Sequence, residues 1–170
     1  MVRRYFPAVH DRLSRIDPGR EDPKHPFRCR YGIFPQFCIN YANGKPVECV
    51  KHLDYKNIAA GVCAVMVYGV FDSKKSHFLV LHDLKLAFEF PAGTVALYPS
   101  SLLVHSNVSI VEATSAEAAL AGAGLPRGSL VWFAQAAYVV SCELGMSLKA
   151  AAEAGLERDP GDVKEAFAVQ

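Results

Sequence analysis

The sequence lacks the features that mark a membrane-spanning, secreted or disordered chain. It contains no run of about 18 apolar residues, so no segment is expected to span a bilayer. The first ten residues have no apolar core of the kind that a secretion signal requires. Neither sign of charge is in surplus, because 18 Lys and Arg face 17 Asp and Glu. With 51% hydrophobic residues among 170, the chain is predicted to form one folded domain, expected inside the cell.

Cysteine is present, but not in a pattern that builds a disulfide framework or a zinc site. The count is five, which is odd, and no Cys-x-x-Cys pair occurs. Disulfide frameworks use even counts, and thiolate zinc sites use closely spaced pairs. Reduced and mostly buried thiols are therefore expected. They are Cys29, Cys38, Cys49, Cys63 and Cys142.

Positive charge gathers in residues 1–30, which hold eight Lys or Arg against four Asp or Glu. Apolar residues recur there at helical spacing, which predicts a helix over 3–16, ended by Asp17-Pro18-Gly19. These apolar positions are Phe6, Val9, Leu13 and Ile16. A connector rich in proline and charge follows over 21–26. Two interpretations of this basic arm stay open, a solvated helix face and a contact with a polyanion.

From residue 31 onward the pattern changes to short runs that are typical of strands. The runs are 32–40, 47–53, 62–71, 77–90, 94–98 and 102–111. Within 84–90, apolar residues alternate with Lys85 and Glu89, as in a strand with one buried face. Turn residues separate the runs at intervals of about ten residues, which favours an antiparallel sandwich or barrel. The chain is therefore predicted to be mainly β with flanking helices (α+β).

Helical patterns interrupt and end this β region. Thr114-Ser-Ala-Glu117 has the spacing of a capping box, so a short helix is expected at 115–121 within an Ala-rich insertion over 113–124. A further strand is expected over 129–140, and the Ala-rich tail is expected to be helical. The predicted divisions are a helix with a basic connector over 1–30, a β core over 31–140 and a helical tail over 141–170.

The pair His52-Leu53-Asp54 carries the clearest chemistry. Residues i and i+2 of a strand project from one face, so this imidazole and this carboxylate can hold one ion. A second histidine, His105, lies in a later β run. Two histidines and a carboxylate on a β scaffold form the facial triad of non-haem Fe(II) oxygenases, which leaves coordination positions open. An isolated His-x-Asp is common by chance, so a purely structural role is the alternative.

Oxygenases of this kind can use a 2-oxo acid together with O2, and the far carboxylate of the 2-oxo acid needs a fixed cation. Arginine suits that task because its guanidinium matches a carboxylate with two hydrogen bonds. Arg127 is the only Lys or Arg between Lys85 and Lys149, and it stands at the entry to the last expected strand. We expect it to bind the co-substrate, the alternative being an exposed loop position after Pro126.

Three stretches, taken in order, resemble the fungal branch of the TET and J-binding-protein family. They are His52 to Asn57, Phe71 to Gly93 and Tyr98 to Asn107. The resemblance covers 31–110 well and 125–140 loosely. Members of this family are Fe(II)- and 2-oxoglutarate-dependent dioxygenases. Their core is a double-stranded β-helix, a jelly-roll or cupin-like fold, which the resemblance implies for this chain.

The resemblance also implies roles for individual residues. The positions that it places at the iron are His52, Asp54 and His105. It implies that Arg127, with Ser129, binds 2-oxoglutarate. Asn57 would face a base flipped out of DNA, and an amide can both donate to and accept from a pyrimidine edge. Gln135 is the nearest polar residue to a strand position from which other members contact the base.

The resulting hypothesis is a dioxygenase that uses Fe(II), 2-oxoglutarate and O2 to oxidise a methylated base in DNA, with 5-methylcytosine as the first choice. Two alternatives stay open. One is the same chemistry on N6-methyladenine, RNA or a protein side chain. The other is a jelly-roll binding protein that has lost turnover. The family's substrate implies residence in the nucleus, and the oligomeric state is left open.

Other residues of interest have ordinary interpretations. His77 and His82 are expected to be strand residues, and the aromatic residues of the β runs are expected in the core. These are Phe88, Phe90 and Trp132. Asn40 and Asn107 could support the site by hydrogen bonding, and turn or strand-end roles explain them equally well. Lys74 and Lys75 could contact phosphates.

Overall fold

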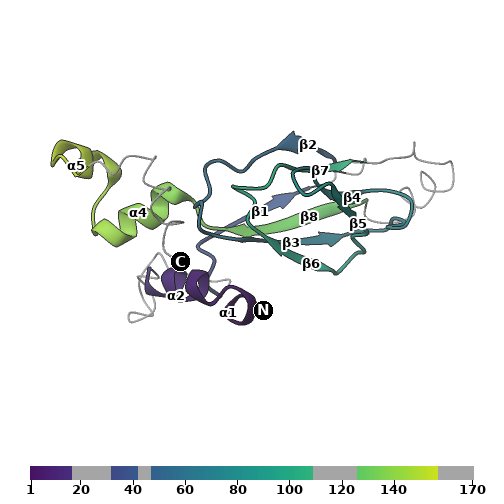
Figure 1. The fold of residues 1–170 in the computed structure, drawn as a ribbon, viewed down its shortest axis with the longest axis horizontal. Helices are drawn as coiled ribbons and strands as arrows, with labels where there is room; N and C mark the ends of the chain where they lie inside the picture. The colour runs from purple at the N-terminus through teal and green to yellow at the C-terminus, as the bar shows by residue number, and fades with distance from the viewer. Residues whose placement is uncertain (17–31, 42–46, 109–125, 157–170) are drawn as a thin grey trace.

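A computed structural model describes residues 1–16, 32–41, 47–108 and 126–156. Their strands form two four-stranded antiparallel sheets, with helices flanking them, as Figure 1 shows. This mostly β, jelly-roll-like architecture confirms the predicted fold class. The helix expected at 115–121, the chain beyond 156 and Cys29 lie outside the described residues. Among the described helices, none has the length and apolarity that crossing a bilayer requires.

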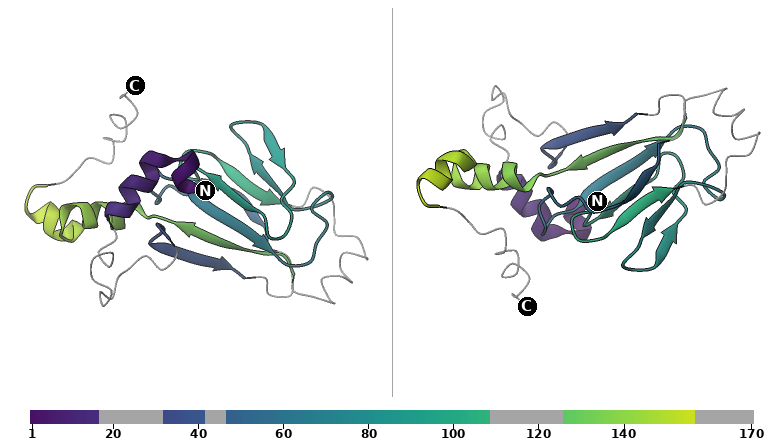
Figure 2. Two further views of the ribbon diagram at one scale, coloured as in Figure 1. Left: turned by 90° about the horizontal axis from the view of Figure 1, so that it is seen from below. Right: turned by 90° about the horizontal axis from the view of Figure 1, so that it is seen from above.

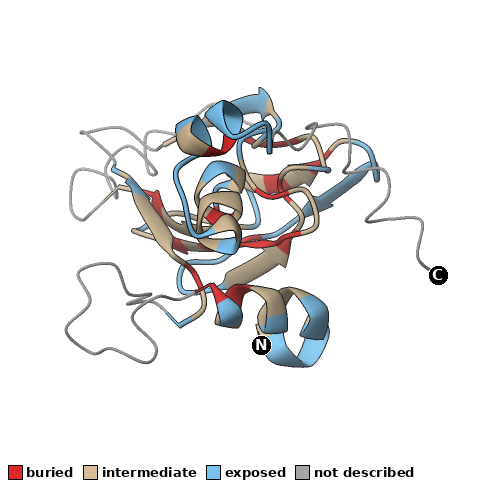
Figure 3. Ribbon diagram, turned by 90° about the vertical axis from the view of Figure 1, so that its left-hand side faces the viewer, coloured by how far each residue is buried: buried red, intermediate tan, exposed pale blue. Residues whose placement is uncertain are grey.

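The first sheet has the strand order β1-β8-β3-β6. Its strands are β1 Gln36–Asn40, β8 Gly128–Phe133, β3 Cys63–Tyr68 and β6 Val95–Tyr98. β3 is buried on both faces, because Ala64 belongs to the core under the helices whereas Val65 and Val67 belong to the core between the sheets. Burial on two sides explains why this run is continuously apolar in the sequence. Figure 3 shows buried segments on strands of the sheets and on the helices that flank them.

The second sheet has the order β2-β7-β4-β5. Its strands are β2 Cys49–His52, β7 His105–Val108, β4 Phe78–Leu81 and β5 Leu86–Phe88. The prediction of a half-buried strand over 84–90 is wrong in its bounds and its burial. Residues 82–85 form a turn, and Leu86 and Phe88 remain 46% and 44% exposed because β5 is the edge strand of the described sheet. Phe90, in contrast, is buried between the sheets as expected.

The amino-terminal helix is divided into α1 Val2–Tyr5 and α2 Pro7–Arg15. The break falls at Phe6, because a residue before proline is disfavoured in the helical conformation. α2 places the buried Leu13 in the core cluster on the outer face of the first sheet. Its Arg12 also makes two hydrogen bonds, of 2.7 and 3.0 Å, to the Glu143 carboxylate. The basic face of this segment therefore contributes an internal ion pair.

The strand expected over 129–140 is shorter, because β8 ends at Phe133 and α4 (Ala136–Leu144) follows. Ala134 and Ala136 leave the sheet and bond to the 56–58 segment, through Ile58 N to Ala134 O and Ala136 N to Lys56 O. From there the helix buries Val139 completely. The helical tail thus begins before residue 141, and α5 (Leu148–Glu153) continues it. Figure 2 shows both helices extending beyond one end of the sheets.

The four described cysteines, Cys38, Cys49, Cys63 and Cys142, are free thiols. Only Cys63 among these four is buried, and the other three are half-buried. The expectation of reduced thiols is thus confirmed for the described positions, and the expected burial holds for one of them.

Candidate metal centre

Strands β2 and β7 bring two histidines face to face at one end of the second sheet. His52 and His105 are partners in the antiparallel ladder, and their ring centroids lie 4.3 Å apart. Residues directly opposite each other project from the same face, so the strand pairing itself makes the imidazoles converge. Asp54 follows at short range. Its Oδ1 lies 3.6 Å from His52 Nε2, and its Oδ2 lies 4.0 Å from His105 Nε2.

Backbone carbonyls determine which nitrogen of each ring is available. His52 Nδ1 lies 2.6 Å from the Val50 oxygen, and His105 Nδ1 lies 2.8 Å from the Leu103 oxygen. Because a carbonyl can only accept, each Nδ1 carries the proton and each Nε2 keeps its lone pair. Burial lowers the pKa of His105, which favours the neutral ring that a metal requires.

The three side chains could hold a metal ion. One ligand atom from each of His52, Asp54 and His105 lies within 4.8 Å of the others. Two imidazole nitrogens and one carboxylate oxygen suit Fe(II) and leave positions open for other ligands. The donor set and its prepared tautomers therefore fit a non-haem iron site.

Asn57 supports the carboxylate of this group. Its Nδ2 donates to Asp54 Oδ2 and to Ser100 Oγ, both at 3.3 Å. The backbone N–H of Asp54 donates to the backbone oxygen of Ser100 at 3.1 Å. Partners of this kind orient a metal ligand and adjust its basicity. Asn57 also lines the cavity beside the triad, so the residue expected to face a base is at the site and bonded to Asp54.

A cavity of about 220 Å³ lies between the sheets and includes the triad in its wall. Ser129 of β8 and Arg127, directly before β8, also line this cavity, so the structure brings the expected co-substrate residues to the same cavity as the expected iron ligands. Apolar and thiol side chains complete the wall. Among them are Cys38, Cys49, Leu79, Phe90, Val131 and Phe133.

Arg127 is buried, with 2% of its surface exposed, which excludes the alternative of an exposed loop position. Its Nη1 donates to the Val47 oxygen at 2.7 Å, and its Nε has no hydrogen-bond partner in the described part of the chain. Burial lowers the pKa of the guanidinium, although the nearby ionisable groups of Cys49 and Glu48 act in the opposite direction. A buried charge is stabilised by a matching anion, so this side chain suits a carboxylate ligand.

The Val47 carbonyl is shared between Arg127 and Asn107. Asn107 Nδ2 donates to it at 3.0 Å, and Asn107 Oδ1 accepts from Cys49 N at 2.8 Å. Val47 N in turn donates to the Arg127 oxygen at 2.9 Å. The buried Asn107 thus joins β7 to the beginning of β2 and shares an acceptor with Arg127 at the end of the other sheet.

Close packing surrounds Ser129. Its Oγ accepts from Asn40 Nδ2 at 2.9 Å, so Asn40 supports the site as suggested. Gly128 lies in β8, where a Cβ atom would overlap the Tyr68 ring and lie 2.8 Å from the Asn40 oxygen. Glycine at this position therefore lets β8 fit between β1 and β3 and keeps its neighbours Arg127 and Ser129 at the cavity.

Gln135 is not brought into the cavity. Its side chain is exposed, its backbone forms an isolated bridge with Asn57, and its N–H donates to Gln36 Oε1 at 2.9 Å. It stands between the end of β8 at Phe133 and the start of α4 at Ala136. The structure therefore places Gln135 near Asn57 through the main chain alone.

His77 and His82 are not strand residues, because they lie just before and just after β4. His77 is buried with a φ of 58°, and its ring meets the Phe71 ring edge-on at 5.7 Å. His82 Nε2 lies 2.9 Å from Ser106 Oγ. The predicted β run over 77–90 included both histidines, whereas turns at 72–76 and 82–85 limit the observed strand to four residues.

No family model and no curated protein sequence matches this chain. Its fold is similar to a solved structure of TET1 from Naegleria (NgTET1) in complex with 5mC DNA. The TM-score is 0.52 and the sequence identity is 17%, over 76% of this chain and 42% of that one. The chain therefore spans less than half the length of that protein. The likeness shows the fold, a jelly-roll-like core with flanking helices.

Proposed function

We propose that this protein is a dioxygenase that uses Fe(II), 2-oxoglutarate and O2 to oxidise the methyl group of a methylated base in DNA, 5-methylcytosine first. One observation carries the proposal. The donor atoms of His52, Asp54 and His105 converge on a cavity whose opposite wall holds the buried, incompletely bonded guanidinium of Arg127.

In this proposal each group has a distinct task. The triad binds Fe(II), which supplies the activation of O2 when it is bound. Arg127 pairs with the far carboxylate of 2-oxoglutarate, and the neighbouring Ser129 hydroxyl lies within the same cavity wall. The apolar wall excludes water from the reacting groups. Overall, 2-oxoglutarate, O2 and a methyl group give succinate, CO2 and a hydroxymethyl group, so each oxygen atom of O2 enters one organic product.

The choice of a nucleobase is supported by the fold's likeness to a protein solved with 5mC DNA. A base in a duplex must leave the stack before an enclosed centre can reach its methyl group. Asn57 lines the cavity beside Asp54, and because its Nδ2 donates to Asp54 and Ser100, its Oδ1 would be the atom that accepts from a base edge. Residence in the nucleus is part of the same proposal, because it follows from the substrate.

The test is turnover on defined oligonucleotides. Protein loaded anaerobically with Fe(II) is given 2-oxoglutarate, O2 and duplexes that carry 5-methylcytosine, N6-methyladenine or no methyl group. We expect succinate and 5-hydroxymethylcytosine, both measured by mass spectrometry, with the first duplex. Asp54→Ala should abolish both products, whereas His10→Ala, on α2, should retain them.

Other outcomes reassign the protein. Succinate formed only with N6-methyladenine, RNA or a protein would keep the chemistry and change the substrate. A folded protein that binds neither Fe(II) nor 2-oxoglutarate would contradict the oxygenase and favour a binding protein built on the same fold.

A further inference from the structure

Exposed side chains alternate with two of the metal ligands in residues 50–56. Val50 is 76% exposed and Tyr55 is 78% exposed, and Leu53 between the ligands also faces solvent. Single exposed apolar residues are ordinary on protein surfaces. Three of them within six residues flank His52 and Asp54 along the chain, so exposed apolar side chains stand next to two ligands of the candidate metal centre.

Positive charge accompanies this surface. Lys51 and Lys56 are both exposed, and Lys56 Nζ lies 5.7 Å from the centroid of the Tyr55 ring. The acidic residues of this part of the chain have other partners. Asp54 is itself a member of the triad, and Glu48 Oε1 lies 4.0 Å from His77 Nδ1. An aromatic face with flanking lysines is the combination that binds the bases and phosphates of an unpaired strand.

We infer that residues 50–56 form a nucleic-acid contact rim beside the cavity. In this rim Tyr55 stacks on a base, and Lys51 and Lys56 contact phosphates. The inference rests on the proposed function, because it names the surface by which the same site takes DNA. Flipping a base leaves its neighbours with unsatisfied stacking surface, and an exposed aromatic ring next to the flipped base can cover it. Backbone contacts by the lysines fix the strand without reading its sequence.

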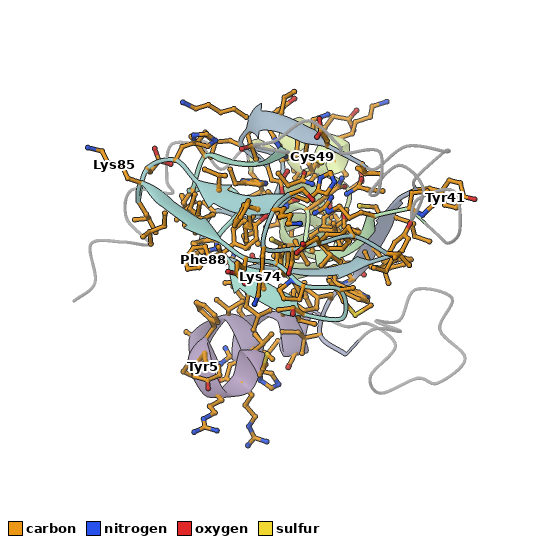
Figure 4. The ribbon with its side chains drawn as sticks, turned by 90° about the vertical axis from the view of Figure 1, so that its right-hand side faces the viewer. Tyr5, Tyr41, Cys49, Lys74, Lys85 and Phe88 are labelled. Carbon is orange, nitrogen blue, oxygen red and sulfur yellow. The ribbon has the colours of Figure 1, made fainter. Side chains whose placement is uncertain are left out.

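The chain contains a matched control for this rim. Tyr5 is 62% exposed and has its own cationic neighbour, since Arg4 Cζ lies 5.5 Å from the Tyr5 ring centroid. This pair belongs to α1, which packs on the helical side of the first sheet, whereas Tyr55 follows β2 of the second sheet. Figure 4 shows Tyr5 far from Cys49, which marks the first residue of β2. Both pairs combine an exposed tyrosine with a cationic side chain, but only Tyr55 follows a ligand of the candidate metal centre in the chain.

The experiment measures the affinity of the full chain, loaded with Mn(II) to prevent turnover, for a fluorescent duplex containing 5-methylcytosine. Fluorescence anisotropy should show binding weakened roughly 5- to 150-fold by Tyr55→Ala, the range expected for one stacked base. Tyr55→Phe should keep most of the affinity, and Tyr5→Ala should keep all of it. Replacing Lys51 and Lys56 together by Ala should reduce the slope of log affinity against log salt by about 1 to 2.

The outcomes separate this inference from the proposed function. If the wild type oxidises methylated DNA and Tyr55→Ala binds the duplex as tightly, the rim is overturned and the proposed function stands. The rim is also overturned if Tyr5→Ala weakens binding as much as Tyr55→Ala. A wild type that does not bind the duplex overturns both. Because Tyr55 is exposed, thermal melting and Mn(II) affinity should be unchanged in its variants, which excludes misfolding as the cause.

Discussion

Asn107 and Arg127 donate to the same carbonyl oxygen, that of Val47, at 3.0 and 2.7 Å. The two side chains come from strands of different sheets, or from their immediate ends, and meet at the beginning of the segment that leads into β2. Because the two side chains share this acceptor, the position of the Arg127 guanidinium depends on the uncharged amide of Asn107.

Replacing Asn107 by Ala should therefore affect both stability and the co-substrate. The change leaves Cys49 N without its acceptor, and an unsatisfied buried group costs about 1–3 kcal/mol. We expect the free energy of unfolding, from urea denaturation, to fall by about 2 kcal/mol. In the proposed reaction, the KM for 2-oxoglutarate should rise more than kcat falls. An unchanged KM with lowered stability would reduce Asn107 to a purely structural residue.

Asn57→Ala should weaken metal binding without removing it. The amide orients the Asp54 carboxylate, and loss of such a partner typically costs 10–100-fold in metal affinity. Titration calorimetry with Mn(II) measures this effect directly. Asp54→Ala should lose binding altogether, and His82→Ala, whose ring bonds to Ser106, should bind like the wild type. Equal affinity of Asn57→Ala and the wild type would contradict the supporting role.

Arg127→Met should separate the metal from the co-substrate. The variant loses the buried charge but leaves the three metal ligands in place. Removing one partner of a buried charge pair costs about 2 kcal/mol or more, so the affinity of the Mn(II)-loaded protein for 2-oxoglutarate should fall about 30-fold or more. Calorimetry should at the same time find unchanged Mn(II) affinity. Retained 2-oxoglutarate binding in this variant would show that another cation holds the carboxylate.

Cys63 should make stability depend on pH at the alkaline end. Its thiol is buried, and burial raises the pKa from 9.0 to about 11. Because the pKa is higher in the folded state, the contribution is complete below pH 9 and is lost as pH rises toward 11. Urea denaturation should show a loss of at most about 3 kcal/mol across this window. Between pH 9 and pH 11, the free energy of unfolding should fall less in Cys63→Ala than in the wild type, whereas Cys142→Ala should lose as much as the wild type. Equal losses in all three proteins would refute this assignment.

We expect the burial of Leu13 to contribute more to the free energy of unfolding than the ion pair between Arg12 and Glu143, two of the contacts by which α2 is attached. Leu13 is buried in the core, and Leu→Ala changes at such positions cost about 2–5 kcal/mol. The Arg12 to Glu143 pair is partly exposed, so Arg12→Ala should cost less than about 1 kcal/mol. Thermal and urea unfolding of the two variants test this order, and the reverse order would contradict it.

The sequence could predict the local parts of this structure. The spacing of His52 and Asp54 defines a shared face on any strand, and the apolar run at β3 requires burial wherever that strand lies. Turn residues separated the β runs well enough to give the fold class. The resemblance to a dioxygenase family then placed His105 and Arg127 at the same site, and their side chains do line one cavity.

The parts that could not be predicted depend on distant partners. Nothing local ends β8 at Phe133, because its exit is set by bonds between residues 134–136 and residues 56–58. The exposure of Phe88 depends on β5 being an edge strand, which alternation does not reveal. Likewise, Asn107 could be proposed as a hydrogen-bonding residue, but its link to Arg127 requires the two sheets to be in place.

Among the described strands, β2 lies at the edge of its sheet and pairs only with β7, through a short and irregular ladder that includes His52 and His105. A metal ion held by His52 and His105 would therefore lie between the edge strand β2 and its partner β7. We expect local opening of β2 to release the ion, because it would separate His52 from His105, whereas β3, buried on both faces, carries none of the three ligands. Added metal should accordingly slow hydrogen exchange at the β2 amides and leave the exchange of β3 unaltered.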